Sequence, residues 1–372
     1  MKTTTLLLRP LDVLHLRGNR LFGGAGDHGE ALMPPWPSAF AGAVLSRALA
    51  DSGRLQEALK KGNGPHIVRD MFGRFSLRWM ALTGNERRNQ LYFPVPADLV
   101  VRRENGLMPE RIVTIPKEKF LGCGLSLPEE LAEIPAIRSA SKAKAEGGYW
   151  LTIEGLERHL EGKEVNGEDL ILTEKLWKID PRLGIAMNPG RRTAEEGKIY
   201  TTEAVALAEG VGFACAFSHE KGDLPKDGLV RLGGDGRGAT VMEYPYGREA
   251  LGKPAPGWKR FRMIFATPCP SKEGWLPPLL KKEQEGYVLT ADGLRARMVS
   301  AAVPRYEVVS GWDVAKREPK PAVRMIPAGS VYWFETIEGD TSALVTLWEK
   351  GLIIDNDDRA REGFGRVWFA IA

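Results

Sequence analysis

The sequence has few cysteines, no long hydrophobic run and no strong charge imbalance. Its three cysteines, Cys123, Cys215 and Cys269, lie far apart and form no C-x-x-C pair, which argues against a disulfide framework and a zinc knuckle. Cysteine usage of this kind fits a reducing compartment, and we predict a cytoplasmic protein. The early apolar run around Leu6 is interrupted from Arg9 onward, too soon for a signal peptide. No segment approaches the roughly 20 apolar residues of a membrane span, so no membrane partner is expected.

Catalytic and metal-binding motifs are also missing. The sequence contains no G-x-S-x-G, H-E-x-x-H or Walker A pattern. None of the five histidines has another histidine four residues away. His15 and His28 flank a glycine-rich stretch and could act as acid and base on a phosphodiester, although a hydrogen-bonded surface histidine is the more common outcome. We therefore predict no enzyme activity, no metal and no cofactor.

The length and composition are those of a soluble protein with about two domains. The chain has 372 residues, of which 43% are hydrophobic and 27% are charged. Its net charge of +4 is too small to establish nucleic-acid binding by itself. Any basic surface must therefore come from local clustering of arginine and lysine.

Hydrophobic periodicity predicts many short strands and few helices. Residues 3–16 are expected to form one long strand or two short ones, broken at Pro10, and a helix over 39–50 begins at the N-cap Ser38. Residues 51–145 are rich in glycine, proline and arginine and are expected to be an irregular insertion. Further strands are predicted at 90–93, 99–102, 149–153, 211–218, 229–232, 240–244, 260–266, 297–304, 323–326, 331–335 and 367–371, with a short helix near 277–282 and a helix or strand at 170–179. The pattern favours two α+β modules, each an antiparallel sheet with helices on one face.

The string at 24–29, Gly-Ala-Gly-Asp-His-Gly, matches the G-x-G-x-x-G fingerprint of dinucleotide-binding folds. That fingerprint works only where its last glycine opens a helix whose amides hold a pyrophosphate. Here Pro34 and Pro35 follow closely, and a proline biases the preceding residue toward extended geometry. A nicotinamide-dependent oxidoreductase is therefore disfavoured. The preceding residues 17–23 hold two arginines and a phenylalanine, which suit an RNA backbone and its bases at least as well.

Glycine–arginine loops recur along the chain, at 188–193, 233–238 and 363–366. An arginine at the tip of such a loop can bind a phosphate while glycine amides approach the same backbone. The structural alternatives are a bulged hairpin for 233–238 and an exposed hairpin with solvated charges for 188–193. Trp312 could stack on a base, although tryptophan is more often buried. The predicted RNA-binding residues are Arg17, Arg20, Phe22, Gly23, Gly24, His28, Arg182, Arg191, Arg192, Thr193, Gly233, Gly234, Arg237, Trp312, Gly363, Gly365 and Arg366.

Taken together and in this order, several segments resemble one family, the third subunit of the type III-B CRISPR Cmr effector complex. This family belongs to the RAMP (repeat-associated mysterious protein) superfamily. The similar segments are 8–12, 17–24, 35–43, 182–185, 192–197, 232–237, 310–313, 326–331 and 363–366. They cover almost the whole chain apart from 51–145. Each motif is weak alone, and the specificity comes from their order.

The resemblance implies two ferredoxin-like (RNA-recognition-motif-like) domains with antiparallel sheets. The first would span 1–200 and carry the insertion at 51–145, and the second would span 201–372 and end in a glycine-rich loop. It further implies a non-catalytic RNA-binding subunit that anchors the 5′ tag of the CRISPR RNA in antiviral defence. Its partners would be the large polymerase-like subunit and the adjacent RAMP backbone subunit. The alternative is a CRISPR RNA-processing endoribonuclease of the same superfamily that uses His15 or His28.

Overall fold

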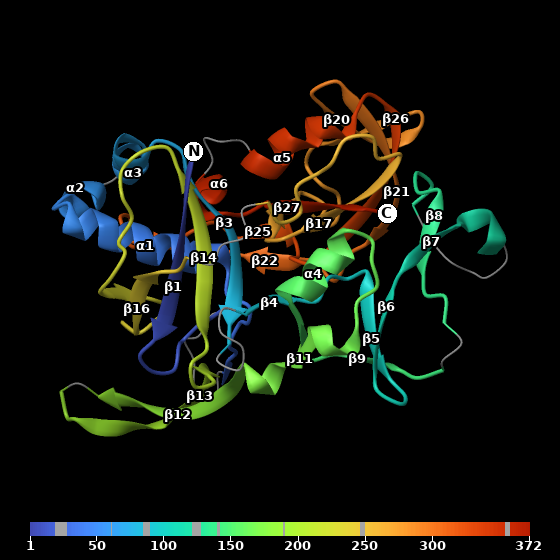
Figure 1. Ribbon diagram of the computed structural model, residues 1–372. Helices are drawn as coiled ribbons and strands as arrows, with labels where there is room; N and C mark the ends of the chain where they lie inside the picture. Colours follow the sequence, from blue (N-terminus) through green and yellow to red (C-terminus); the bar gives the residue numbers. More distant parts are fainter. Residues whose placement is uncertain are drawn as a thin grey trace. The chain divides into compact units, whose positions relative to one another are not determined.

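The computed structural model describes residues 1–18, 28–60, 62–84, 90–120, 128–139, 142–188, 190–245, 250–353 and 358–372. Short strands predominate, most of them paired antiparallel, and helices are few (Figure 1). This confirms the mixed α+β class. Contacts group the chain into two compact units: unit 1 comprises 1–90, 173–247 and 308–322, and unit 2 comprises 91–172, 248–307 and 323–372. The domain limits expected from the sequence, 1–200 and 201–372, stay a prediction.

Unit 1 is built on an antiparallel sheet in which β1 (Lys2–Pro10) is a central strand. β1 pairs with β14 (Gly212–His219) on one side and with β16 (Gly238–Glu243) on the other. β3 (Phe75–Thr83) and β15 (Leu229–Arg231) extend the order to β3-β14-β1-β16-β15. Every residue of β14 is buried, and because side chains alternate along a strand, both faces of the sheet are covered there.

Helix α1 (Pro37–Asp51) packs beside this sheet, with its Phe40 ring centroid 5.0 Å from that of Phe213 in β14. Proline occupies the first turn of the helix, where its missing N–H needs no partner. The N-cap is Trp36 and not Ser38 as the sequence predicted. His28–Gly29 form a short strand, β2, so the last glycine of the G-x-G-x-x-G string opens no helix and the dinucleotide interpretation fails.

Two expectations about local structure are wrong. Much of the described part of 51–145 is regular, because β3 alone is a nine-residue, largely buried strand. Charged turns separate these short elements, so the alternation of apolar and polar residues along each strand is difficult to recognise in the sequence. The helix expected near 277–282 is instead strand β19 (Leu280–Glu283). The other elements of 51–145 are α2 (Leu55–Ala58), α3 (Gly64–Phe72), β4 (Leu91–Pro94), β5 (Leu99–Arg103), β6 (Leu107–Arg111), β7 (Val113–Pro116), β8 (Glu133–Ala136) and β9 (Ala145–Glu146).

Two long strands, β12 (Trp177–Asn188) and β13 (Thr193–Leu207), form an extended two-stranded ribbon in unit 1 (Figure 1). β2 pairs in parallel with β13 at Thr201 and Thr202. Tyr200 lies over Gly184, where a Cβ would come 2.3 Å from the ring. The ribbon exposes a row of apolar side chains, which are Ile179, Leu183, Ile185, Met187 and Ile199.

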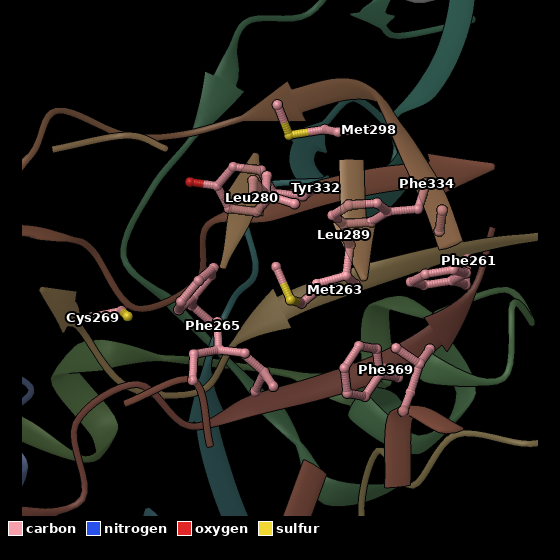
Figure 2. Close-up of a cluster of buried hydrophobic side chains, with 14 of the residues drawn as sticks. Phe261, Met263, Phe265, Cys269, Leu280, Leu289, Met298, Tyr332, Phe334 and Phe369 are labelled. Atoms are coloured by element: carbon pink, nitrogen blue, oxygen red, sulfur yellow. The ribbon is translucent and has the colours of Figure 1, made fainter. Parts of the chain in front are cut away.

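Unit 2 contains a six-stranded sheet of order β19-β20-β21-β26-β17-β27. Its core is rich in aromatic side chains (Figure 2). Phe261 and Phe334 stack with ring centroids 5.1 Å apart, and Phe265 meets Tyr332 edge to face at 5.5 Å. Aromatic pairs in these geometries are stabilising beyond their buried area. The strands are β17 (Arg260–Phe265), β20 (Gly286–Ala291), β21 (Leu294–Ala302), β26 (Val331–Glu338) and β27 (Val367–Ile371).

The remaining elements are short. Unit 2 also holds β10 (Tyr149–Thr152), β11 (Leu170–Leu172), β18 (Cys269–Pro270), β25 (Val323–Ile326), α4 (Ile153–Leu160), α5 (Val345–Lys350) and α6 (Asp358–Glu362). β22 (Glu307–Val309) precedes β23 (Trp312–Asp313) and β24 (Glu318–Pro319), the small hairpin of unit 1. Within the described ranges, no helix is long and apolar enough to cross a membrane.

A buried group of charged side chains ties three segments of unit 2 together. Asp98 follows β4, His159 lies on α4 and Arg262 on β17, and none is more than 1% exposed. Arg262 forms an ion pair with Asp98, and His159 Nε2 lies 2.8 Å from the other Asp98 oxygen. An ionised carboxylate only accepts hydrogen bonds, so Nε2 carries the proton. Arg262 also donates to the His159 carbonyl (2.6 Å) and to that of Ile371 (3.0 Å).

Candidate nucleic-acid interface

Three of the predicted arginines, Arg17, Arg182 and Arg237, gather at one end of the unit 1 sheet. Their charges all act on one side chain, His15, which lies between the end of β1 and Arg17. Arg182 comes from the β12–β13 ribbon, and Arg237 from the loop between β15 and β16. We call this group, together with Gly233 and Gly234, the arginine cluster.

The glycine loop that carries Arg237 is held against the chain segment of His15. The amide of Gly234 donates to the His15 carbonyl at 2.8 Å. Gly233 has a φ of +81°, and a Cβ there would lie 2.9 Å from the same oxygen, so glycine satisfies both the backbone and the space. The loop joins antiparallel β15 and β16, as the hairpin alternative predicted. It also presents Arg237 beside the two glycines, as the phosphate hypothesis requires.

Each arginine of the cluster faces a carboxylate. Arg237 Nη1 lies 2.5 Å from Asp12 Oδ2, and Arg182 Nη2 lies 3.0 Å from Asp180 Oδ2. Arg17 Nη2 is 3.7 Å from Asp235 Oδ2. The pKa of Asp12 is lowered, first by a hydrogen bond from the Val13 amide and then by the charges of Arg237 and Arg182. These pairs lie at the surface, where such interactions are weak and screened by salt.

The two histidines that could have been catalytic lie in different surroundings. His15 is only 6% exposed, and burial lowers its pKa, an effect that Asp235 opposes and the arginine charges reinforce. Its imidazole is therefore neutral and enclosed at neutral pH. His28 is more exposed, and its ring nitrogens lie 2.8 Å from Thr201 Oγ1 and 3.1 Å from Glu203 Oε1.

The tip of the ribbon presents a second basic group. The Asn188 side-chain oxygen accepts hydrogen bonds from the amides of Gly190 and Arg191, both at 3.0 Å. The amide of Arg192, whose φ is +54°, donates to the Asn188 carbonyl at 2.8 Å. The turn is thus held by Asn188, while the side chains of Arg191, Arg192 and Thr193 are exposed.

Trp312 is exposed on the β23–β24 hairpin, with 59% of its surface accessible. It lies opposite Pro319 in the register of that hairpin. Lys316, at the turn, is within 4 Å of Asp313 and Glu318. An exposed indole beside basic residues can stack on a base, and base stacking on Trp312 stays a prediction.

The family model described as CRISPR-associated protein (Cas_Cmr3) matches residues 6–370. The chain belongs to the Cas_Cmr3 family. The resemblance found in the sequence is confirmed, and this family member is a subunit of a type III-B CRISPR effector complex.

Solved structures show the same fold. A chain of the cryo-electron-microscopy structure of type III-B Cmr-β bound to cognate target RNA and AMPPNP is 14% identical, covering 99% of this chain and 100% of that chain with a TM-score of 0.50. A chain of Cmr-β bound to cognate target RNA is 15% identical, covering 98% and 96% with a TM-score of 0.50. No curated protein matches the sequence.

In the C-terminal loop of this Cas_Cmr3 member, the arginine makes its hydrogen bonds within unit 2 and the glycines allow the turn. Arg366 is 5% exposed, its Nη1 donates to the Glu349 carbonyl at 2.8 Å, and its amide donates to Thr267 Oγ1 at 3.0 Å. Gly363 and Gly365 have φ values of +91° and +71°. An RNA contact by these three residues stays a prediction, and the function proposed below depends on unit 1.

Sequence reasoning missed the carboxylates of the arginine cluster. Asp180 could have been found, because residues two apart on a strand share a face and Arg182 is its i+2 neighbour. The pairing of Asp235 with Arg17 joins loops more than 200 residues apart, so no local signal marks it. The predicted residues Arg20, Phe22, Gly23 and Gly24 lie outside the described residues.

Proposed function

We propose that this chain is the non-catalytic RNA-binding subunit that anchors the 5′ tag of the CRISPR RNA in a type III-B effector. The observation that carries the proposal is the arginine cluster, in which Arg17, Arg182 and Arg237 converge beside the Gly233–Gly234 loop. Three guanidinium groups and accessible glycine backbone suit consecutive phosphates of one strand.

Two further surfaces of unit 1 extend this interface. The exposed Arg191 and Arg192 lie at the tip of the ribbon whose strand β12 also carries Arg182. The exposed Trp312 offers a stacking platform for an unpaired base. Phosphate contacts would position the strand, and stacking would favour a single-stranded segment such as a tag.

The proposal also covers the architecture and the partners. Each unit contains an antiparallel sheet and at least one helix, which supports two ferredoxin-like domains. The structures of Cmr-β with target RNA support an RNA-bound assembly for a chain with this fold. Within it, this subunit would contact the large polymerase-like subunit and the adjacent RAMP backbone subunit.

The test compares two labelled RNAs by fluorescence anisotropy: a guide with its 5′ tag and the same guide with a scrambled tag. We expect the full chain to prefer the tagged RNA. Arg237→Ala should weaken binding about tenfold or more, because hydrogen bonds to a charged group contribute roughly 1.5–3 kcal/mol each. Loss of one phosphate contact should also reduce the steepness of the plot of log K against log salt concentration, by about 0.7 in slope for a single strand.

Arg54→Ala is the matched control. Arg54 is 31% exposed against 26% for Arg237, and it too is held by carboxylates, those of Glu57 and Asp70. Both variants remove one positive charge from unit 1. Equal effects of the two changes, or equal binding of tagged and scrambled RNA, would contradict tag anchoring by the arginine cluster.

The endoribonuclease alternative is tested on the same material. The chain is incubated with a precursor CRISPR RNA in the absence of metal, and the products are resolved on a denaturing gel. We expect no cutting, since His15 is enclosed and neutral and His28 is occupied by Thr201 and Glu203. Cutting that disappears in His15→Ala or His28→Ala would establish the nuclease instead.

A further inference from the structure

We propose that Asp12, Asp180 and Asp235 compete with RNA for the arginine cluster, because they occupy the positions of RNA phosphates in the free protein. This inference rests on the proposed function of the arginine cluster. Each of the three arginines faces one of these carboxylates, at distances from 2.5 to 3.7 Å. A carboxylate and a phosphate present similar oxygens to a guanidinium, so one can replace the other.

The exposure of these ion pairs allows a phosphate to replace the carboxylate at each arginine. The side chains of Asp12 and Asp235 are each 58% exposed, and that of Asp180 is 35% exposed. Exposed ion pairs contribute little to stability, so separating them has a small cost. Once displaced, each carboxylate returns to water, whereas a buried one would leave an uncompensated charge.

The arginines are also held in place by more than their carboxylates. The main chain of the Arg237 loop is fixed by hydrogen bonds of Gly234 and Leu232, at 2.8 and 2.9 Å. Arg182 lies in the register of two long paired strands. The main chain that carries Arg182 and Arg237 is therefore positioned without the carboxylates, and we assign to the carboxylates the role of competing with the ligand.

Competition of this kind lowers the affinity of every strand that contacts the arginines, because one ion pair must be separated for each arginine. A strand that reaches only one arginine gains one contact and must separate one ion pair, which reduces the net gain in binding free energy. A strand of matching shape displaces all three carboxylates and keeps its base contacts in addition. Phosphate contacts alone therefore give weak binding, and a strand needs base contacts as well to bind tightly.

The test is a double-mutant cycle on the full chain, measured by anisotropy with the tagged guide and with a polyuridine strand of equal length. Asp12→Asn should tighten binding of polyuridine about two- to five-fold, the range expected from an exposed ion pair, and binding of the tagged guide by at least as much. In the Arg237→Ala background, Asp12→Asn should have a much smaller effect, because only the charge of Arg182 then acts on Asp12. Asp235→Asn should behave like Asp12→Asn but independently of Arg237→Ala.

Asp223→Asn serves as the control for net charge. Asp223 is 86% exposed and lies 4.0 Å from Lys2, at the start of β1, whereas Asp12 lies beyond the other end of that strand. The nine residues of β1 span about 26 Å, well beyond the screening length of roughly 8–10 Å. This variant should leave both affinities unchanged.

Several results would overturn the inference. Weaker binding by Asp12→Asn would mean that the carboxylate positions Arg237. A gain that is undiminished in the Arg237→Ala background, or that Asp223→Asn reproduces, would mean a general charge effect. Absence of any tag preference in the unmodified chain would overturn the proposed function itself, whereas normal tag preference with no gain in Asp12→Asn would overturn this inference alone.

Discussion

Replacing Asp98 by asparagine should strongly destabilise unit 2. The change keeps the shape of the side chain but removes the charge that balances Arg262, which is 1% exposed and cannot reach water. Breaking a buried ion pair from one side typically costs about 3–5 kcal/mol, because the remaining charge is left uncompensated. For a unit of this size, each kcal/mol lowers Tm by about 2–4 °C, so a fall of roughly 6–20 °C is expected.

The same group makes the stability of unit 2 depend on pH. Burial alone would raise the pKa of Asp98, but the charges of His159 and Arg262 outweigh burial and hold it well below its usual range. A carboxyl whose folded pKa is depressed contributes stability above its unfolded pKa of about 3.9, and this contribution is lost as the pH falls through the folded pKa. The stability difference between the unmodified chain and Asp98→Asn should therefore be full at neutral pH and shrink below about pH 4.

Thermal unfolding followed by circular dichroism at several pH values measures both effects. Asp70→Asn is the matched control, because Asp70 also pairs with an arginine, Arg54, at 2.5 Å, but its side chain is 65% exposed. That variant should leave Tm nearly unchanged. An Asp98→Asn variant as stable as Asp70→Asn at pH 7, or a difference that grows in acid, would refute the reasoning.

Two further predictions concern the glycine loop and the thiols. Gly233→Ala and Gly236→Ala both place a side chain at positive φ, which costs roughly 1–2 kcal/mol, but only the Gly233 methyl meets the His15 carbonyl, at 2.9 Å. Gly233→Ala should therefore lose more stability in urea titrations and more tag affinity, and equal losses would contradict the contact. Burial raises the pKa of the Cys215 and Cys269 thiols, so Ellman's reagent at pH 8 should label them only after unfolding. Labelling of both in the native chain, detected by peptide mass mapping, would show that they are accessible.

Local patterns in the sequence were enough to predict several elements. The strands expected at 323–326 and 367–371 match β25 and β27, because short apolar runs bounded by turn residues leave few alternatives. The predicted end of the first strand at Pro10 is confirmed by β1, since proline supplies no amide for a further pairing. The helix near 277–282 failed because Leu280 is the buried residue of a strand whose next three residues are exposed. One apolar residue among charged ones does not distinguish the hydrophobic periodicity of a helix from that of a strand.

The arginine cluster could be predicted only as separate loops. Arg17, Arg182 and Arg237 were each named from a local glycine or proline context, which says nothing about their distance from one another. They meet because β1 pairs with β16 and because the β12–β13 ribbon adjoins the segment after β1. Pairing between strands so far apart in sequence is a property of the tertiary fold. The carboxylates that face the arginines follow from the same pairing.

The central position of β1 has a consequence for how the chain is made. Its partners β14 and β16 follow it by about 200 residues or more, and the last pairing reaches Glu243. At a synthesis rate of roughly 5–20 residues per second, about 10–50 s pass between the synthesis of β1 and that of its partner strands. During that time the apolar triplet Leu6-Leu7-Leu8, later fully enclosed, has no strand to cover it. Unit 1 is therefore a late-folding element of its own polypeptide, and its yield in cells should respond to translation speed and to chaperones that shield nascent strands.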